Sequence, residues 1–288
     1  MCRLFGMSGG PRPVRATFWL LEAPDSLAQQ SRREPDGTGL GSFDDQDRPV
    51  VAKQPLAAYE DEAFAQEARE VRSRTFVAHV RYASTGGLVL QNTHPFCQHD
   101  RLFAHNGVIQ GLDRLDAELG RDRALVEGAT DSERFFALIT REIDRAGGDV
   151  AAGIAAATDW VARELPLLSA NFVLITATEL WALRYPDTHE LYVLERGAGG
   201  PTGARHLEHA SARGSVRVRS SDLASAPAVV VATERMDEDP GWRSIESGEL
   251  LHIGPDGRAH RKIILPDPPA HRLTLADLDP HAASSQSG

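Results

Sequence analysis

Short runs rich in β-branched and aromatic residues occupy both ends of this 288-residue chain, and two segments with apolar residues at helical spacing lie between them. The central helices are predicted over residues 132–145 and 150–164. An order of strands, then helices, then strands favours an α+β layered domain over an alternating parallel-sheet fold. The strands are predicted at residues 4–10, 38–43, 75–82, 102–104, 172–177, 180–184, 191–194, 216–218, 228–232, 250–253 and 261–265.

The same pattern divides the chain into one domain and a tail. We expect a single domain over residues 2–265, with two further helical segments, at 18–30 and 60–71, in its first third. Residues 266–288 are rich in Pro, Ala and Ser. Because such a composition buries little apolar surface, we expect this tail to pack loosely or to be disordered.

The charge balance limits the possible partners. The sequence carries 31 Lys and Arg against 41 Asp and Glu, a formal net charge of −10. Nucleic acids and anionic membranes both favour clustered positive charge, so we expect a small molecule or a protein instead. No apolar run approaches the roughly 20 residues of a membrane span, and the first residues lack the basic-then-apolar order of a signal peptide. We therefore expect a cytoplasmic protein.

Cys2 is one of only two cysteines, and so few in a chain of this length are typical of a reducing compartment with free thiols. Removal of Met1 would leave Cys2 with both a thiol and a free α-amine. An α-amine titrates at about pH 7.7–8.0 and a thiol at about 8.5, so the pair could act as base and nucleophile near neutrality. The alternative is that Cys2 is a small buried apolar residue.

Three further sequence features each have a plain structural explanation. Arg81 lies at the C-terminal end of a predicted strand, where a surface ion pair would account for it. Asn106-Gly107 is a strong local signal for a hairpin turn. Asp131 begins a predicted helix, within a sequence typical of an N-terminal cap.

Neither a metal nor a cofactor is expected. His94, His99 and His105 lack a recognised metal-ligand spacing, and we expect His94 and His105 to brace loops by hydrogen bonding. The glycine-rich run 37–41 lacks the Lys-Ser/Thr pair and the strand-to-helix context of a phosphate-binding loop. We interpret that run as close strand packing.

Six motifs follow one another along the chain: Met1-Cys2-Arg3-Leu4-Phe5-Gly6, Pro35-Asp36-Gly37, His79-Val80-Arg81-Tyr82-Ala83-Ser84, Asn92-Thr93-His94-Pro95-Phe96, His105-Asn106-Gly107 and Asp131-Ser132-Glu133. In this order and spacing they resemble the glutaminase domain of class II glutamine amidotransferases. The resemblance is strongest to the stand-alone branch that includes the ergothioneine-pathway γ-glutamyl hydrolase and YafJ-like proteins. It extends through most of the chain, to residues 229–234 and Trp242. It implies a four-layer αββα sandwich, the Ntn-hydrolase fold, with the active site at one end of the sheets.

The resemblance also implies which residues bind the substrate. Arg81 would bind the α-carboxylate with its guanidinium fork, and Asp131 would accept the α-ammonium group. Tyr82, Ser84 and Thr85 belong to the loop after Arg81 and would contact the substrate. This loop differs from that of the synthase-linked members, so the implied specificity is for a γ-glutamyl head group, with glutamine as one candidate substrate.

The implied reaction begins with attack of the Cys2 thiol on a γ-glutamyl amide, with the Cys2 α-amine as base. The Asn106 side-chain amide and the Gly107 backbone N–H would form the oxyanion hole, where losing one donor typically costs about 10²–10³ in rate. Hydrolysis of the thioester then releases glutamate, after ammonia or an amine has left. The alternative is a non-catalytic or ammonia-supplying subunit of a larger amidotransferase complex, with a synthase as partner protein.

Overall fold

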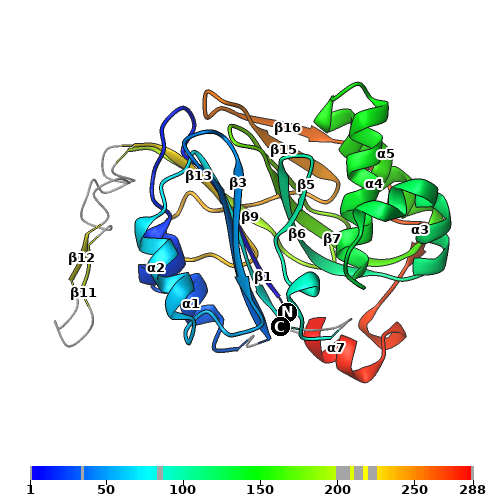
Figure 1. The fold of residues 1–288 in the computed structure, drawn as a ribbon, viewed down its shortest axis with the longest axis horizontal. Helices are drawn as coiled ribbons and strands as arrows, with labels where there is room; N and C mark the ends of the chain where they lie inside the picture. Colours follow the sequence, from blue (N-terminus) through cyan, green and yellow to red (C-terminus); the bar gives the residue numbers. More distant parts are fainter. Residues whose placement is uncertain are drawn as a thin grey trace.

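The computed structural model describes residues 2–33, 36–82, 87–198, 208–210, 217–219 and 226–286. Two large sheets lie face to face, and helices cover the outer face of each (Figure 1). The layers are therefore helix, sheet, sheet and helix. This confirms the α+β class and the four-layer order expected from the sequence.

The first sheet is antiparallel throughout and places the start of the chain at its centre, because β1 pairs with both β13 and β4. Its strand order is β14-β9-β13-β1-β4-β2-β3. The strands are β1 (Arg3–Ser8), β2 (Gly37–Phe43), β3 (Pro49–Gln54), β4 (Thr75–Arg81), β9 (Tyr192–Arg196), β13 (Ala228–Ala232) and β14 (Arg243–Ser244).

The second sheet has the order β16-β15-β8-β7-β6-β5, and β17 joins it by a parallel pairing with β7. Its strands are β5 (Phe96–Gln98), β6 (Arg101–Ile109), β7 (Pro166–Ile175), β8 (Leu180–Leu183), β15 (Glu249–Ile253), β16 (Ala259–Ile263) and β17 (His271–Arg272). A separate two-stranded sheet consists of β11 (Glu208–Ala210) and β12 (Arg217–Arg219).

Alternation along β4 decides which of its side chains enter the space between the sheets. Phe76, Ala78 and Val80 pack toward η1 (Phe18–Glu22), α1 (Leu27–Gln30) and α2 (Glu62–Glu70), whereas Val77 belongs to the apolar core between the sheets. Successive strand residues point to opposite faces. His79 and Arg81 therefore share the inter-sheet face with Val77.

The other helical layer covers the second sheet with α3 (Leu112–Leu119), α4 (Asp131–Arg145) and α5 (Val150–Glu164). Its core contains stacked aromatic rings, with Phe103 of β6 and Phe136 of α4 at a centroid separation of 4.8 Å. The two short helices η2 (Leu90–Asn92) and η3 (Gly120–Leu125) complete this part of the chain. None of the described helices has the length and apolar character that crossing a bilayer requires.

The strand predicted at residues 102–104 is longer in the structure, and the hairpin turn that was the alternative explanation of Asn106-Gly107 does not form. Both residues continue β6, where they pair with Asn171 and Ala170 of β7. A Cβ atom at Gly107 would overlap the carbonyl oxygen of Ser169, so the glycine here permits a close strand approach. Tertiary pairing has overridden the local turn preference.

The helix predicted over residues 18–30 is also divided. The structure has a short π-helical turn, η1, and then the single turn of α1, with Pro24 between them. Proline has no backbone N–H to donate to a continuing helix, which accounts for the break.

The described residues after 265, where a loose tail is expected, contain regular elements. They form β17, then η5 (Leu275–Asp277) and α7 (Pro280–Gln286), which lies beside the start of the chain (Figure 1). Leu278 and Ala282 are buried in a small apolar cluster with Val108 and Leu168. These few apolar residues at helical spacing hold a segment whose composition is otherwise polar. The domain limit at residue 265 stays a prediction.

Candidate active site

Cys2 lies just before β1, beside the end of β4. The register pairs Arg3 with Val80, which brings Cys2 opposite the last residues of that neighbouring strand. The Cys2 Sγ accepts a hydrogen bond of 3.2 Å from the Tyr82 backbone N–H and donates one of 3.3 Å to the Tyr82 carbonyl. The thiol is thus held by backbone groups, and Cys2 is only 8% exposed.

The second sheet contacts the same residue through Asn106, which points into the inter-sheet space from β6. Its side-chain Nδ2 donates a 2.9 Å hydrogen bond to the backbone carbonyl of Cys2. A carboxamide nitrogen carries two hydrogens, so the second one is left for a further acceptor. Gly107, the next residue, is half-buried and lines the same cavity as Cys2.

Arg81 is the cation of the site and is 4% exposed. Its Nη1 donates to the carbonyl of Gly87 at 3.2 Å. Burial lowers the pKa of Arg81, while the negative charges of Cys2, Asp36 and Asp131 act in the opposite direction and raise it. One buried guanidinium therefore lies within electrostatic reach of two carboxylates and the thiol.

Asp131 is the first residue of α4 and is not its N-cap. The cap is Thr130, whose hydroxyl accepts a 3.2 Å hydrogen bond from the backbone N–H of Glu133. Asp131 Oδ2 instead accepts a 2.9 Å hydrogen bond from the backbone N–H of Ile109, at a register irregularity of β6. This contact fixes the carboxylate between the helix and the strand.

One cavity brings most of the predicted site residues together. Cys2, Arg81, Tyr82, Gly107 and Asp131 line it, and Asn106 contacts it through Cys2. The volume left open is about 20 Å³. Ser84 and Thr85 lie outside the described residues. The remaining lining residues, which the sequence reasoning did not place in the site, are His79, His94, His105, Thr130, Ser132 and Gln286.

His79 and His94 form a buried ring pair with centroids 4.1 Å apart. Burial lowers the pKa of His79 to about 3 and that of His94 well below 6.5, so both rings are neutral at physiological pH. Neither ring nitrogen of His94 has a hydrogen-bond partner among the described residues, which makes the expectation for His94 wrong. His105 does hydrogen-bond, to Ser132 at 2.9 Å. The alternation of β4 was the available signal, since it places His79 on the face of Arg81.

Other candidate sites have weaker support. A larger cavity of about 240 Å³, bounded by Ser8 and Arg196, lies at the opposite end of β1 and contains none of the predicted site residues. Within the described ranges, no three His, Cys, Asp or Glu side chains are grouped to hold a metal ion. Cys97 is an exposed free thiol on β5.

The chain is similar in sequence to known proteins over the region that contains these residues. The family described as glutamine amidotransferases class-II matches residues 1–272. The γ-glutamyl-hercynylcysteine sulfoxide hydrolase of Mycolicibacterium smegmatis is 30% identical over 264 residues, 88% of this chain and 96% of that protein. The yeast protein described as "Probable glutamine amidotransferase DUG3", from Saccharomyces cerevisiae, is 32% identical over 170 residues, 52% of this chain and 47% of its own.

A solved structure shares the architecture. The glutamine phosphoribosylpyrophosphate amidotransferase of B. subtilis superposes with a TM-score of 0.64 at 19% identity, covering 92% of this chain and 50% of that one. This likeness confirms the Ntn-hydrolase fold. The chain spans about half the length of this structure and of the yeast relative.

Proposed function

Because the chain belongs to the class II glutamine amidotransferases, we propose that it cleaves a γ-glutamyl amide bond through a thioester on Cys2. Membership of this family identifies the chain as an amidohydrolase. The observation that supports this particular chemistry is the position of the Cys2 thiol, between the backbone of Tyr82 and the contact from Asn106, in one cavity with Arg81 and Asp131.

The charges of the cavity fit an α-amino acid head group. Such a group presents a carboxylate and an ammonium on one carbon, and the cavity is lined by the Arg81 guanidinium and the Asp131 carboxylate. An Arg fork binds a carboxylate by two parallel hydrogen bonds, and a carboxylate accepts hydrogen bonds from an ammonium group. Binding both groups would leave the substrate's side-chain amide to extend toward Cys2.

The proposed first half-reaction forms the thioester. As the Cys2 sulfur bonds to the amide carbon, its proton passes to the Cys2 α-amine. The oxygen that becomes negative accepts hydrogen bonds from the free hydrogen of the Asn106 amide and from the Gly107 N–H. Collapse breaks the C–N bond, and the leaving nitrogen takes the proton from the α-ammonium.

Water completes the second half-reaction. It attacks the thioester carbonyl and gives a proton to the α-amine, and the C–S bond breaks to release glutamate. The proton returns to the thiolate. The leaving group is ammonia from glutamine and an amine from a γ-glutamyl conjugate, the class of substrate that the name of the M. smegmatis relative denotes. No residue other than Cys2 has to change its protonation state.

The test uses protein whose Met1 has been removed, verified by intact mass. We expect glutamate release from glutamine or from a γ-glutamyl amide, and we expect Cys2→Ala to abolish it. Cys97→Ala is the matched control, because this exposed thiol lies on β5 outside the cavity. Activity that survives Cys2→Ala would exclude the thioester mechanism.

Met1 removal gives a second, independent check. With Met1 retained, the Cys2 nitrogen is part of a peptide bond and cannot act as a base, so that form should be inactive.

A synthase partner protein stays a prediction, which co-purification from the source cell tests.

A further inference from the structure

The last turn of α7 reaches the cavity that contains Cys2. Gln286 is 2% exposed and lines that cavity together with Cys2 and Arg81. The remaining volume of about 20 Å³ has room for roughly one water molecule. A γ-glutamyl group is larger than this volume, and Gln286 is one of the side chains that bound it.

Gln286 is held by a specific polar contact. Its Oε1 lies 3.1 Å from His189 Nε2, and His189 is itself 5% exposed. Nearer the start of α7, the ring of His281 lies 6.2 Å from the ring of Tyr82, whose backbone contacts the Cys2 thiol. Two residues of α7 therefore contact the surroundings of the nucleophile.

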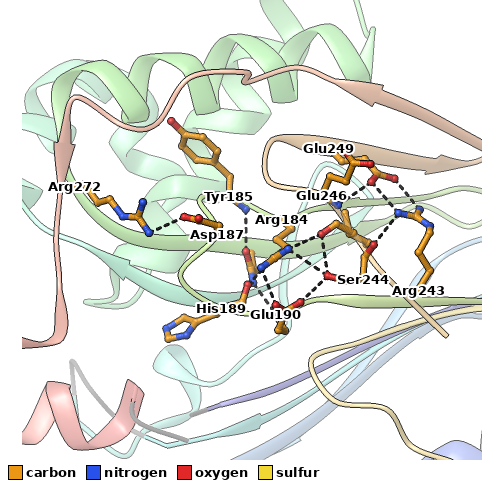
Figure 2. A network of polar contacts seen from close by, with 12 residues as sticks. Arg184, Tyr185, Asp187, His189, Glu190, Arg243, Ser244, Glu246, Glu249 and Arg272 are labelled. Carbon is orange, nitrogen blue, oxygen red and sulfur yellow. Dashed lines mark hydrogen bonds and ion pairs between the residues drawn. The ribbon is translucent and has the colours of Figure 1, made fainter. Parts of the chain in front are cut away.

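Several polar contacts hold the backbone of the loop that contains His189 (Figure 2). Arg184 Nε donates a 2.8 Å hydrogen bond to the His189 carbonyl, and the same guanidinium donates to Ile245 O at 2.8 Å. Asn171 Nδ2 donates to the His189 carbonyl at 3.2 Å. Arg184 also forms an ion pair of 3.1 Å with Glu190. The backbone that presents the His189 ring is thus tied to the second sheet and to the segment around residue 245.

The attachment of α7 is much weaker. The helix has only seven residues, and helices of that length are not stable without packing. Its apolar anchor is a small cluster of four buried residues, among them Leu278 and Ala282 of the C-terminal segment, with the partly buried Leu273 and Ala283 packed against it. The ion pair of 2.6 Å between Arg272 and Asp187, also visible in Figure 2, lies on the surface, where such pairs contribute little.

We propose that Gln286 occupies the substrate site in cis, with His189 as its receptor, so that α7 must undock before a γ-glutamyl amide can bind. The carboxamide of Gln286 is the same functional group as the scissile amide of glutamine. Binding to a partly occupied site raises the apparent dissociation constant in inverse proportion to the fraction of sites left open, without changing the chemistry of the bound state. The expected effect on substrate binding rests on the proposed function, whereas the position of Gln286 in the cavity of Cys2 does not.

Alkylation of Cys2 measures the occupancy without using catalysis. Iodoacetamide is added to the full-length protein, and mass spectrometry follows the labelling of Cys2 relative to the exposed Cys97 in the same molecule. We expect Cys2 to be labelled about tenfold faster or more than in the parent when Gln286 is replaced by Ala or when residues 280–288 are removed. The reason is that undocking of α7 controls the access of the reagent to Cys2. Gln46→Ala, in an exposed turn, is the matched control and should label like the parent. An unchanged Cys2 rate in a folded Gln286→Ala protein overturns the proposal.

Steady-state kinetics then test the substrate competition. With Met1 removed, Gln286→Ala should lower KM for glutamine about tenfold or more and leave kcat within about twofold. An unchanged KM, or a fall in kcat matching the change in KM, contradicts the proposal. Loss of glutamate release in the parent and in every variant would instead contradict the proposed function, and the labelling result would still decide whether Gln286 covers Cys2.

Discussion

The Asn106 side-chain amide donates a 2.9 Å hydrogen bond to the backbone carbonyl of Cys2, although 104 positions separate the two residues in the chain. The contact joins the two sheets at the point where the candidate nucleophile lies, because Asn106 belongs to β6 of the second sheet and Cys2 precedes β1 of the first. The donor proposed for the oxyanion and the nucleophile are therefore held in a fixed relation by the fold.

Asn106→Ala removes this contact and the proposed oxyanion donor together. We expect kcat for glutamate release to fall by about 10²–10³, with a much smaller change in KM, because the lost interaction is formed mainly in the transition state. Steady-state kinetics on the Met1-cleaved protein measure both values. A kcat within twofold or so of the parent would exclude Asn106 from the oxyanion hole.

Arg81→Lys keeps the positive charge of the site and removes the guanidinium fork. Since a lysine offers a single point charge to the substrate carboxylate, KM for glutamine should rise about tenfold or more. Arg72→Lys is the control, because Arg72 is exposed and, within the described part of the chain, donates only to the carbonyl of Pro13, at 3.1 Å. Equal KM values for the two variants would contradict the assignment of Arg81.

Gly107→Ala tests the strand geometry of the site. The added methyl group would overlap the Ser169 carbonyl oxygen of the neighbouring strand, so we expect a loss of about 1–3 kcal/mol in the free energy of unfolding. Gly197→Ala is the matched control, because among the described residues, its chain neighbours aside, no atom lies within 4 Å of the added Cβ. Urea unfolding followed by circular dichroism compares the two, and equal midpoints would count against the close approach.

The buried histidines predict a loss of stability in mild acid. Burial lowers the pKa of His79 from 6.5 to about 3, so between these values the unfolded chain binds a proton that the folded chain does not. The contribution of neutral, buried His79 to the free energy of unfolding is therefore complete above pH 6.5. It declines as the pH falls toward 3, by roughly 1.4 kcal/mol per pH unit.

His79→Gln removes that proton uptake. As the pH is lowered from 6.5 to 5, the free energy of unfolding decreases in both proteins. We expect the decrease in His79→Gln to be about 2 kcal/mol smaller than in the parent. Urea titrations at the two pH values measure this difference, with the exposed His271→Gln as control. The same pH dependence in His79→Gln and the parent would contradict the neutral, buried state of His79.

Much of the architecture was predictable because the local signals agree with the tertiary structure. The β-branched run before Arg81 predicted β4 and placed Arg81 at its end, and the spacing of apolar residues predicted α4 and α5 closely. Thr130 was within the predicted cap and is the residue that caps α4. α3 was missed, although Leu112, Leu115 and Leu119 have helical spacing between two glycines.

The errors arose where a long-range contact outweighs a local preference. Asn106-Gly107 is a strong turn signal, yet pairing with β7 keeps it in a strand, and only the position of Ser169 explains the glycine. The composition of the tail also gave no signal for α7, which packs in a small apolar cluster and contacts His189. No sequence pattern indicated that Gln286 would line the cavity of Cys2.

The proposed mechanism requires that Cys2 becomes acylated. Met1-cleaved protein is mixed with excess glutamine, or with a γ-glutamyl amide, and quenched in acid within one turnover, and the N-terminal peptide is then weighed by mass spectrometry. We expect this peptide to gain the mass of one glutamyl group, hydroxylamine to remove that group, and Cys2→Ala never to carry it. Glutamate release with no adduct on Cys2, or an adduct on Cys97 instead, would contradict the thioester mechanism.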